Sequence, residues 1–475
     1  MTMSLPSDLG EMETGRMSQR TDAGDKLTDL FAYVDDHRDR YIEQLRTLLR
    51  QPSVAAQHDG MDETAEMVRS MFSDTGAKPR LIDIRGGFPV VYAEIDGTSP
   101  KTLSFYNHYD VQPAEPLDLW TSDPWAAEIR DGRIWARGVS DNKGNIAARI
   151  AAIDAYRTVR STLPLSVKFI IEGEEEIGSP HLGQFADEHA DLCQADACIW
   201  EFGGTDFDGR PLVHLGLKGI CYVELRVRGA SGDQHSSVAT SVPNPAWRLV
   251  WALASLKDPD ERVLIPGFYD AVVPPTADEI NALERMPDTE VRRLEHFGID
   301  RFLLGLTGLE LRKRDYLEPT CTISGLLSGY TGEGSKTVLP SRAIAKIDMR
   351  LVPDQDPHEI FTLLRRHLDA EGFTDIEAVL LGPERPARTP LTAPIASVVV
   401  DTWRELTGLE PVVVPTSAGS GPWWELCGRF NIDACTAGVG HARSQAHAPN
   451  ENIYVDDYIR GIKHICAIID RFARV

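Results

Sequence analysis

Short apolar segments alternate with segments of helical periodicity between residues 27 and 200. Buried strands are expected at "PVVYAEID", "KTLSFYNH" and "LSVKFII", which are short, apolar and rich in β-branched and aromatic residues. Helices are expected at "LTDLFAYVDDHRDRYIEQLRTLLR", "MDETAEMVRSMF" and "KGNIAARIAAIDAYRTV", where apolar residues recur at helical spacing. This alternation predicts an α/β domain in which helices cover both faces of a mostly parallel sheet.

The pattern changes near residue 216. The segment "CYVELRVRG" alternates strictly between apolar and polar residues, as expected of a strand with one wet face. A helix, a polar helical insertion at about 258–318, two strands, a helix and a strand follow. Without the insertion, this series predicts a ferredoxin-like α+β layer. The predicted division is therefore a flexible tail at 1–25, a first domain at 26–215 and 389–475, and an inserted second domain at 216–388.

Composition narrows the classes of partner and compartment. The formal charge of -23, from 49 basic and 72 acidic residues, argues against binding to nucleic acid or to an anionic membrane. No apolar run approaches the roughly 18 residues of a membrane span, and the N-terminal residues resemble neither a signal nor a transit peptide. The seven scattered cysteines argue against a disulfide framework. A cytoplasmic protein is expected.

A histidine and a carboxylate end one of the expected strands. His108 and Asp110 lie two residues apart in "HYDVQP", and in an extended segment such residues point to the same side. One histidine nitrogen can then bind a metal while the carboxylate orients the ring. The simpler interpretation is a loop histidine with an ordinary hydrogen bond.

Other metal-binding side chains also follow expected strands. Glutamates fill four of the five positions 172–176, at the end of an apolar strand, where they repel one another unless cations or protons intervene. A solvated charge run is the alternative, but such runs normally lie on helix surfaces. Asp141 precedes a helix, where it is otherwise a simple helix cap; Glu201 follows another strand, and His447 lies in a polar loop. Together they predict a dinuclear site with nitrogen and oxygen ligands at one rim of the sheet.

Six motifs, in this order, resemble one family: "HYDVQP", "ARGVSDNKG", "EGEEEIGS", "GDQHSS", "IDMRLVP" and "HAPNENI". It is the co-catalytic metallopeptidase family of carnosine dipeptidases, aminoacylase, glutamate carboxypeptidase and succinyl-diaminopimelate desuccinylase. The resemblance covers about residues 27–475 and is greatest to the dipeptidase branch, through "PGFYD" and "GYTGEGSKTVLP". It implies an aminopeptidase-like catalytic domain with an inserted lid domain, through which the family usually dimerises.

The resemblance also implies roles for residues of the catalytic domain. Asp141 would bridge two divalent metal ions. His108 and Glu201 would complete the ligands of one ion, and Glu176 and His447 those of the other. Zinc is the first expectation, with manganese or cobalt as alternatives. Asp110 would support His108. Glu175 would be the general base that takes a proton from the water bridging the metals, although the sequence alone does not distinguish it from the adjacent glutamates.

Four lid-domain and loop residues match the family's substrate-binding positions. His235 in "GDQHSS" would cross the dimer to donate to the oxyanion, with help from Thr337. Arg350 would grip a substrate carboxylate with two parallel hydrogen bonds, and Ser420 would bind the same end. Simpler interpretations exist for two of them, since His235 could cap a turn and Arg350 could be a surface arginine of a strand.

The expected enzyme is a metal-dependent hydrolase that cleaves the amide bond of dipeptides or similar small substrates with a free carboxylate. The dipeptidase branch usually has aspartate at the position of Glu201, whereas carboxypeptidase and deacylase members usually have glutamate. An N-acyl or N-carbamoyl amino acid amidohydrolase, or a carboxypeptidase, is therefore the alternative. A catalytically silent metal-binding dimer is the third possibility, but all five ligand positions and the base carry competent side chains.

Overall fold

The computed structural model describes residues 27–475, so the tail expected at 1–25 lies outside the described residues. The chain divides into two compact units. The first contains the described residues up to Val213 with Pro394–Pro411 and Thr436–Val475, and the second contains His214–Ala393 and Val412–Cys435. The two main boundaries lie close to those expected from the sequence.

The segment Val412–Cys435 requires a correction of the expected division. The sequence pattern predicts that all of 389–475 lies in the first domain, but this segment belongs to the second unit. Backbone hydrogen bonds are the reason. The Leu215 amide donates to the Val414 carbonyl at 3.0 Å, and the Ser417 amide donates to the Gly216 carbonyl at 2.7 Å. The segment is thereby attached to the start of the second unit.

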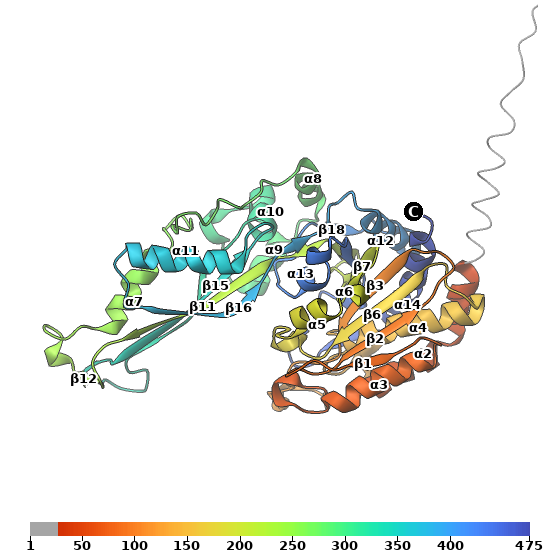
Figure 1. Ribbon diagram of the computed structural model, residues 1–475, viewed down its shortest axis with the longest axis horizontal. Coiled ribbons are helices and arrows are strands. Elements are labelled where there is room, and N and C mark those ends of the chain that lie inside the picture. The colour runs from red at the N-terminus through yellow and green to blue at the C-terminus, as the bar shows by residue number, and fades with distance from the viewer. Residues whose placement is uncertain (1–26) are drawn as a thin grey trace, which may run out of the picture. The chain divides into compact units, whose positions relative to one another are not determined.

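The central sheet of the first unit is parallel at its centre (Figure 1). The strands within this unit follow the order β1 (Arg80–Ile82), β2 (Val90–Ile95), β6 (Ser166–Glu172), β3 (Thr102–His108) and β7 (Ala197–Trp200). Strand β3 is parallel to both β6 and β7, whereas β2 is antiparallel to β1 and β6. The sheet is therefore mixed, with an antiparallel pair at one edge.

Helices cover this sheet. Strands β3 and β7 are buried at almost every position, which requires cover on both faces because successive side chains point to opposite sides. Helix α3 contacts β1 and β2, and α4 contacts β3 and α14. The predicted α/β class is confirmed. Among the described residues, the helices of this unit include α2 (Arg38–Leu49), α3 (Met61–Ser73), α4 (Lys143–Arg160), α5 (Leu182–Glu188), α6 (Ala190–Cys193), α12 (Pro394–Thr407) and α14 (Val455–Phe472).

Smaller strands complete the first unit. Strand β5 (Arg133–Trp135) pairs with β4 (Glu128–Arg130) and with β21 (Asn452–Tyr454). Strand β8 (Gly204–Thr205) pairs with β20 (Gly440–His441). These pairings attach the C-terminal loop at 441–451 to the rim of the first unit, near the carboxyl ends of the parallel strands.

The second unit has an antiparallel sheet with helices on one face. Its strand order is β13 (Thr322–Ser328), β15 (Arg342–Leu351), β11 (Gly219–Arg228) and β16 (Glu377–Glu384). Helices α7 (Pro245–Ala254) and α11 (Pro357–Ala370) pack on the apolar side chains of one face, such as Cys221, Val223 and Ile347. With α7 and α11 as the two crossover helices, this is the predicted ferredoxin-like arrangement.

The insertion is helical, as predicted. It contains α8 (Ala277–Arg285), α9 (Glu290–Phe297) and α10 (Gly308–Leu317). The buried Lys218 ammonium donates to the carbonyl oxygens of Asp315 and Glu318 at 2.8 and 2.7 Å, which caps the end of α10. Among residues 27–475, no helix combines the length and the apolar character needed to cross a membrane.

Candidate metal centre

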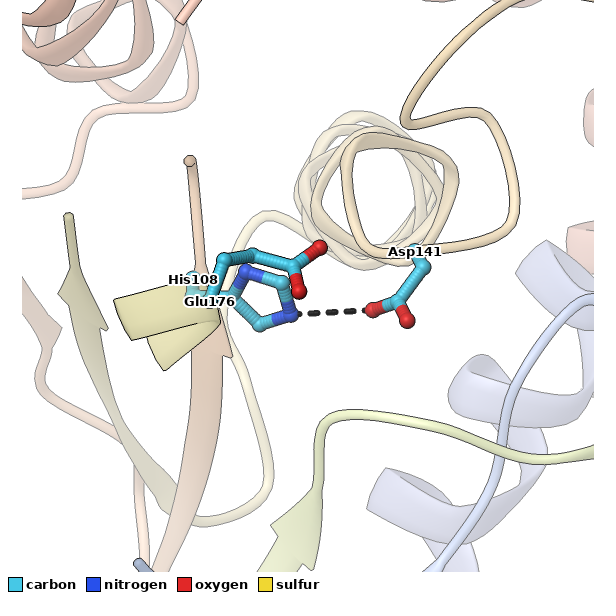
Figure 2. Close-up of side chains that lie close together, drawn as sticks. All are labelled: His108, Asp141 and Glu176. Carbon is cyan, nitrogen blue, oxygen red and sulfur yellow. Dashed lines mark hydrogen bonds and ion pairs between the residues drawn. The ribbon is translucent and has the colours of Figure 1, made fainter. Parts of the chain in front are cut away.

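His108 is the last residue of β3, and its side chain is buried. Its Nδ1 lies 3.2 Å from Asp110 Oδ1 and 3.1 Å from the Asp110 carbonyl oxygen. Its Nε2 lies 3.0 Å from Asp141 Oδ1 (Figure 2). Asp110 therefore holds one ring nitrogen and directs the other toward Asp141, as a ligand histidine requires.

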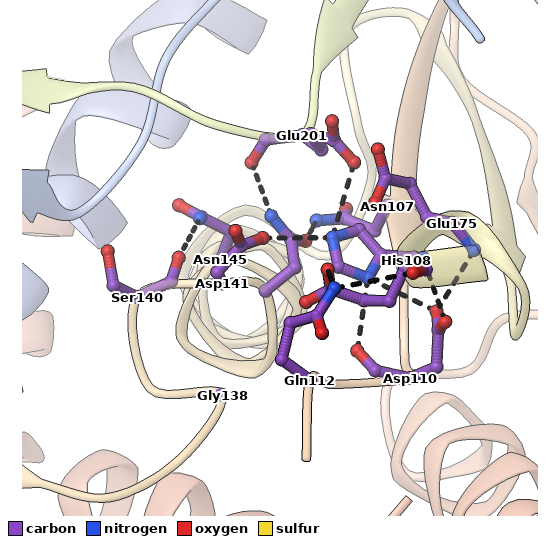
Figure 3. Close-up of polar contacts among 12 residues, drawn as sticks. Asn107, His108, Asp110, Gln112, Gly138, Ser140, Asp141, Asn145, Glu175 and Glu201 are labelled. Atoms are coloured by element: carbon purple, nitrogen blue, oxygen red, sulfur yellow. Dashed lines mark hydrogen bonds and ion pairs between the residues drawn. The ribbon is translucent and has the colours of Figure 1, made fainter. Parts of the chain in front are cut away.

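Asp110 also positions the glutamate segment that follows β6. Its Oδ1 accepts the Glu175 backbone amide at 3.3 Å, and its Oδ2 accepts the Glu176 amide at 3.0 Å. One buried carboxylate thus orients both a histidine ring and the short 3-10 helix Glu175–Ile177 (Figure 3). The spacing of His108 and Asp110 indicated the first contact, but not the second.

Asp141 lies between two histidines. Its Oδ1 faces His108, and its Oδ2 lies 3.2 Å from His447 Nε2. The same His447 nitrogen lies 3.1 Å from Glu176 Oε2. The His447 side chain is 55% exposed, so it forms the open side of the site. The two oxygens of one carboxylate therefore face two separate sets of nitrogen and oxygen donors.

Two further carboxylate oxygens of the site have no hydrogen-bond donor among residues 27–475. Glu176 Oε1 and Glu201 Oε2 are buried and accept no hydrogen bond, although Glu201 Oε2 lies 3.4 Å from His108 Nε2. A single donor atom from each of His108, Asp141 and Glu176 lies within 4.8 Å of the others. Buried carboxylate oxygens without donors are costly. The donor set, of imidazole and carboxylate, therefore fits divalent cations.

The structure distinguishes the glutamates that the sequence left equivalent. Glu172 accepts hydrogen bonds from the Tyr106 and Ser179 hydroxyls at 2.6 and 2.8 Å. Glu174 pairs with His181 at 2.8 Å. Among the described residues, no donor hydrogen-bonds to the Glu175 carboxylate. Glu175 is thus the glutamate whose side chain is available to a substrate or a water molecule.

The site is strongly acidic, and its pKa values reflect this. Burial, and then the charge of Asp141, raises the pKa of Glu201 to about 8, with His108 opposing. Burial and the charge of Glu201 also raise the pKa of Glu175 well above its usual value. Hydrogen bonds to Asp141 and Glu176 raise the pKa of His447 to about 10. Positive charge is therefore favoured at the centre of the cluster.

Glu451 is a site residue that the sequence analysis missed. It is completely buried four residues after His447. Its Oε1 accepts the amides of Ser140 and Asp141 at 2.8 and 3.0 Å, and its Oε2 accepts the Gly138 amide at 2.8 Å. The Arg137 guanidinium pairs with it at 2.9 Å. Glu451 therefore fixes the loop that carries Asp141. Its position within "HAPNENI", in a polar loop, gave no signal of this role.

Arg149 is a second missed residue. Its buried guanidinium donates to the Tyr106 carbonyl at 2.6 Å and also reaches the Trp200 carbonyl. It joins the ends of β3 and β7, next to His108 and Glu201. A charged residue in the otherwise apolar run "GNIAARIAA" was the available signal, because a buried arginine requires several acceptors.

We expect Glu451→Gln to weaken divalent-metal binding about 10- to 100-fold, because the amide presents N–H groups to backbone donors and the Asp141 loop loses its fixed position. Calorimetric titration of the metal-free protein with Zn²⁺ would measure this. Glu43→Gln is the matched control, because Glu43 is an exposed partner of Arg46 and Arg50 on α2. Equal affinity in the Glu451 and Glu43 variants would contradict the positioning role.

Comparison with known proteins agrees with this geometry. The family described as "Peptidase family M20/M25/M40" matches residues 104–471, which is most of the chain. The chain belongs to this family. The Beta-Ala-His dipeptidase of Rattus norvegicus is 30% identical over 378 residues, covering 72% of this chain and 74% of the relative. The family resemblance stated from the motifs is thereby confirmed.

Two other M20 relatives are similar over nearly their whole length. The Cys-Gly metallodipeptidase dug1 of Schizosaccharomyces pombe is 28% identical over 484 residues, covering 94% of this chain and 99% of the relative. The crystal structure of an M20 family metallo-carboxypeptidase, Sso-CP2 from Sulfolobus solfataricus, is 39% identical with a TM-score of 0.87. That similarity covers 92% of this chain and 99% of the other.

The four expected substrate-binding residues of this M20 peptidase lie in the second unit. Arg350 and Ser420 contact each other, with Arg350 Nη1 donating to Ser420 Oγ at 2.8 Å. Arg350 also pairs with Asp348 through two hydrogen bonds of 3.0 and 3.1 Å. His235 and Thr337 form a second group, because His235 of β12 (Gln234–His235) pairs with Val338 of β14 (Val338–Leu339), and the Ser236 amide donates to the Thr337 carbonyl at 3.1 Å.

The two groups lie at opposite ends of strand β15. Thr337 and β14 precede β15, whereas Arg350 is the last residue but one of β15. The ten residues of β15 span about 30 Å, whereas a dipeptide spans about 7 Å. A dipeptide in contact with Arg350 therefore does not reach His235 of the same M20 chain. His235 is exposed, and its Nδ1 accepts the Ser237 amide at 3.1 Å.

Proposed function

We propose that this M20 peptidase hydrolyses the amide bond of dipeptides with a free C-terminal carboxylate, and that it uses two divalent cations. The single observation that carries the proposal is Asp141, whose two oxygens face two histidines, each with a further carboxylate nearby. The dipeptidase activity named for the relatives from Rattus norvegicus and Schizosaccharomyces pombe supports the substrate class.

His108, Asp141 and Glu201 would hold one cation, and Asp141, Glu176 and His447 the other. Zinc suits these nitrogen and oxygen ligands best, and manganese or cobalt would also fit. A bound pair of such cations polarises a carbonyl group and lowers the pKa of water from 15.7 to about 7. Asp110 keeps the His108 ring in the orientation that presents Nε2.

Glu175 would act as the general base that accepts the proton of the attacking water. Two observations support this role. No hydrogen bond occupies its carboxylate among residues 27–475, and burial near other carboxylates raises its pKa. A carboxylate with a raised pKa is a better proton acceptor near neutral pH. The same group can then return the proton to the leaving amine.

Arg350 would bind the substrate carboxylate through its guanidinium, with the Ser420 hydroxyl as a further donor. The Asp348 pair and the contact with Ser420 fix the orientation of the guanidinium. Two parallel hydrogen bonds from arginine to a carboxylate are strong and directional. This contact would select substrates with a free C-terminus.

His235, assisted by Thr337, would donate to the oxyanion in the site of a second copy of the chain. The distance between His235 and Arg350 along β15 supports action in trans. Exposed apolar residues of the second unit support a homodimer. Trp247 and Trp251 on α7 are 58% and 56% exposed, and Leu326 and Leu327 are exposed on the edge strand β13. Large exposed apolar patches commonly mark protein interfaces.

We propose a cytoplasmic location, because the seven scattered cysteines argue against a disulfide framework.

Trimming of a peptide C-terminus is a second candidate. Glu201, where the dipeptidase branch usually has aspartate, favours it, and so does the 39% identity to the metallo-carboxypeptidase Sso-CP2. Removal of an acyl or carbamoyl group from an amino acid is a further alternative, which Glu201 also favours. These reactions would use the same cations and the same base, and they differ only in what lies on the amino side of the scissile bond.

Metal removal and a substrate screen test the proposal together. A chelator is expected to abolish activity, and Zn²⁺, Mn²⁺ or Co²⁺ to restore it, because the carboxylates need the cations to act on water. Free dipeptides, N-acetyl amino acids and longer peptides would be compared as substrates of the restored enzyme. Turnover of blocked amino acids alone would refute the dipeptidase proposal, and full activity in the chelator would refute the metal centre.

A further inference from the structure

Three side chains form a row on the antiparallel sheet of the second unit, on the face that α7 and α11 leave uncovered. Ile220 on β11 pairs with Arg350 on β15 and with Glu384 on β16. Cross-strand partners point to the same side of a sheet. Because neighbouring strands lie about 4.8 Å apart, the Cα atoms of Arg350 and Glu384 are about 10 Å apart. A cation and an anion thus flank a half-buried apolar side chain.

The two charged ends of this row differ in their partners. Arg350 is paired with Asp348 and contacts Ser420. Glu384 Oε2 is buried and accepts no hydrogen bond, and no cation among residues 27–475 pairs with this carboxylate. Burial raises the pKa of Glu384 to about 7, against the opposing charge of Arg350. A buried carboxylate without a donor is costly, and a donor brought by a ligand would remove this cost.

Two cations close in sequence to this row have partners of their own. The Lys218 ammonium donates to the carbonyl oxygens of Asp315 and Glu318 at the end of α10. Arg385 follows Glu384 in the chain, but its guanidinium pairs with Asp356 and lies over the Trp424 ring. Neither side chain neutralises Glu384.

We propose that Arg350, Ile220 and Glu384 form a subsite for an amino acid with a positively charged side chain, so that the enzyme prefers substrates that end in lysine or arginine. This inference rests on the proposed binding of the substrate carboxylate by Arg350. The aliphatic stem would lie over Ile220, and the terminal cation would donate to Glu384. A fully extended lysine side chain reaches about 6 Å from Cα to Nζ. This fits within the separation of about 10 Å between the Cα atoms of Arg350 and Glu384.

Binding of free amino acids tests the subsite without any turnover. Lysine and norleucine share the carboxylate, the amine and the stem, and differ in the terminal ammonium. Calorimetric titration of the metal-loaded enzyme is expected to give at least about tenfold tighter binding of lysine, because hydrogen bonds to charged groups are strong. Glu384→Gln should abolish this preference. Equal affinities for lysine and norleucine in the unchanged enzyme would overturn the subsite, whatever the variants do.

Hydrolysis of Ala-Lys and Ala-norleucine gives the second measurement. The ratio of their kcat/KM values is expected to fall at least about tenfold in Glu384→Gln, and Glu384→Lys should favour Ala-Glu over Ala-Lys. Glu377→Gln, at the exposed start of β16, should leave the ratio unchanged. An unchanged ratio in both Glu384 variants would refute the subsite.

The two measurements separate this inference from the proposed function. If lysine binds selectively through Glu384 but no dipeptide is cleaved, the subsite stands and the dipeptidase proposal fails. If both dipeptides are cleaved equally well and both amino acids bind equally, the dipeptidase proposal stands and the subsite fails.

Discussion

Replacing Glu175 with glutamine is expected to lower kcat about 10²- to 10⁴-fold while the protein keeps its bound metal ions, because a glutamine cannot accept the proton of the attacking water. The Glu175 side chain has no hydrogen-bond donor among the described residues, so the substitution breaks no hydrogen bond of the fold. Steady-state kinetics on a dipeptide, together with metal analysis of the purified variant, would measure both effects.

Glu174→Gln is the matched control for this prediction. Glu174 lies next to Glu175 in the chain, but its carboxylate pairs with His181. Its replacement should change kcat by less than about tenfold. If Glu175→Gln retained the turnover of the unchanged enzyme, or if Glu174→Gln lost as much, the base would have been assigned to the wrong glutamate.

His235→Ala is expected to lower kcat about 10²- to 10³-fold, the usual loss for one oxyanion donor. His235 is exposed, and among the described residues its side chain hydrogen-bonds with Ser237 alone. The fold should therefore tolerate the change, which circular dichroism would check. A loss of less than about threefold would contradict the proposed role.

Mixing two inactive variants shows whether His235 acts in trans. In a dimer of one His235→Ala chain and one Glu175→Gln chain, one site receives both intact residues if His235 serves the partner. Random exchange makes half of the dimers mixed, so about a quarter of the unchanged activity should return. If His235 acted within its own chain, each site would keep one defect and mixing would restore nothing.

Much of the first unit was predictable because its signals are local. Strands β3 and β6 are rich in apolar residues at their centres, which is typical of strands buried on both faces, and α4 and α14 show helical periodicity. His108 ends β3 and Asp110 follows it, and the glutamates lie at the end of β6 and just after it. The antiparallel pairing of β2 with β6 was not predicted, because the apolar composition of a buried strand does not indicate its direction relative to its neighbours.

The missed residues depend on contacts between distant segments. Glu451 binds the backbone of residues 138–141, more than 300 residues earlier. No local pattern marks such a residue, since its partners are amide groups that every sequence possesses. The same reason explains the segment Val412–Cys435, whose place in the second unit is set by hydrogen bonds to residues 215–218.

The sequence by itself determined the two architectures, the family and the residue types available for metal binding, because periodicity and short motifs are properties of neighbouring residues. Only the tertiary structure decided which carboxylates remain without donors. All five residues Glu172, Glu174, Glu175, Glu384 and Glu451 carry the same carboxylate. In the fold, Glu172 accepts from hydroxyl groups, Glu174 pairs with an imidazole and Glu451 accepts from backbone amides. The carboxylates of Glu175 and Glu384 have no such partner within residues 27–475, and they are the ones proposed to act on the substrate.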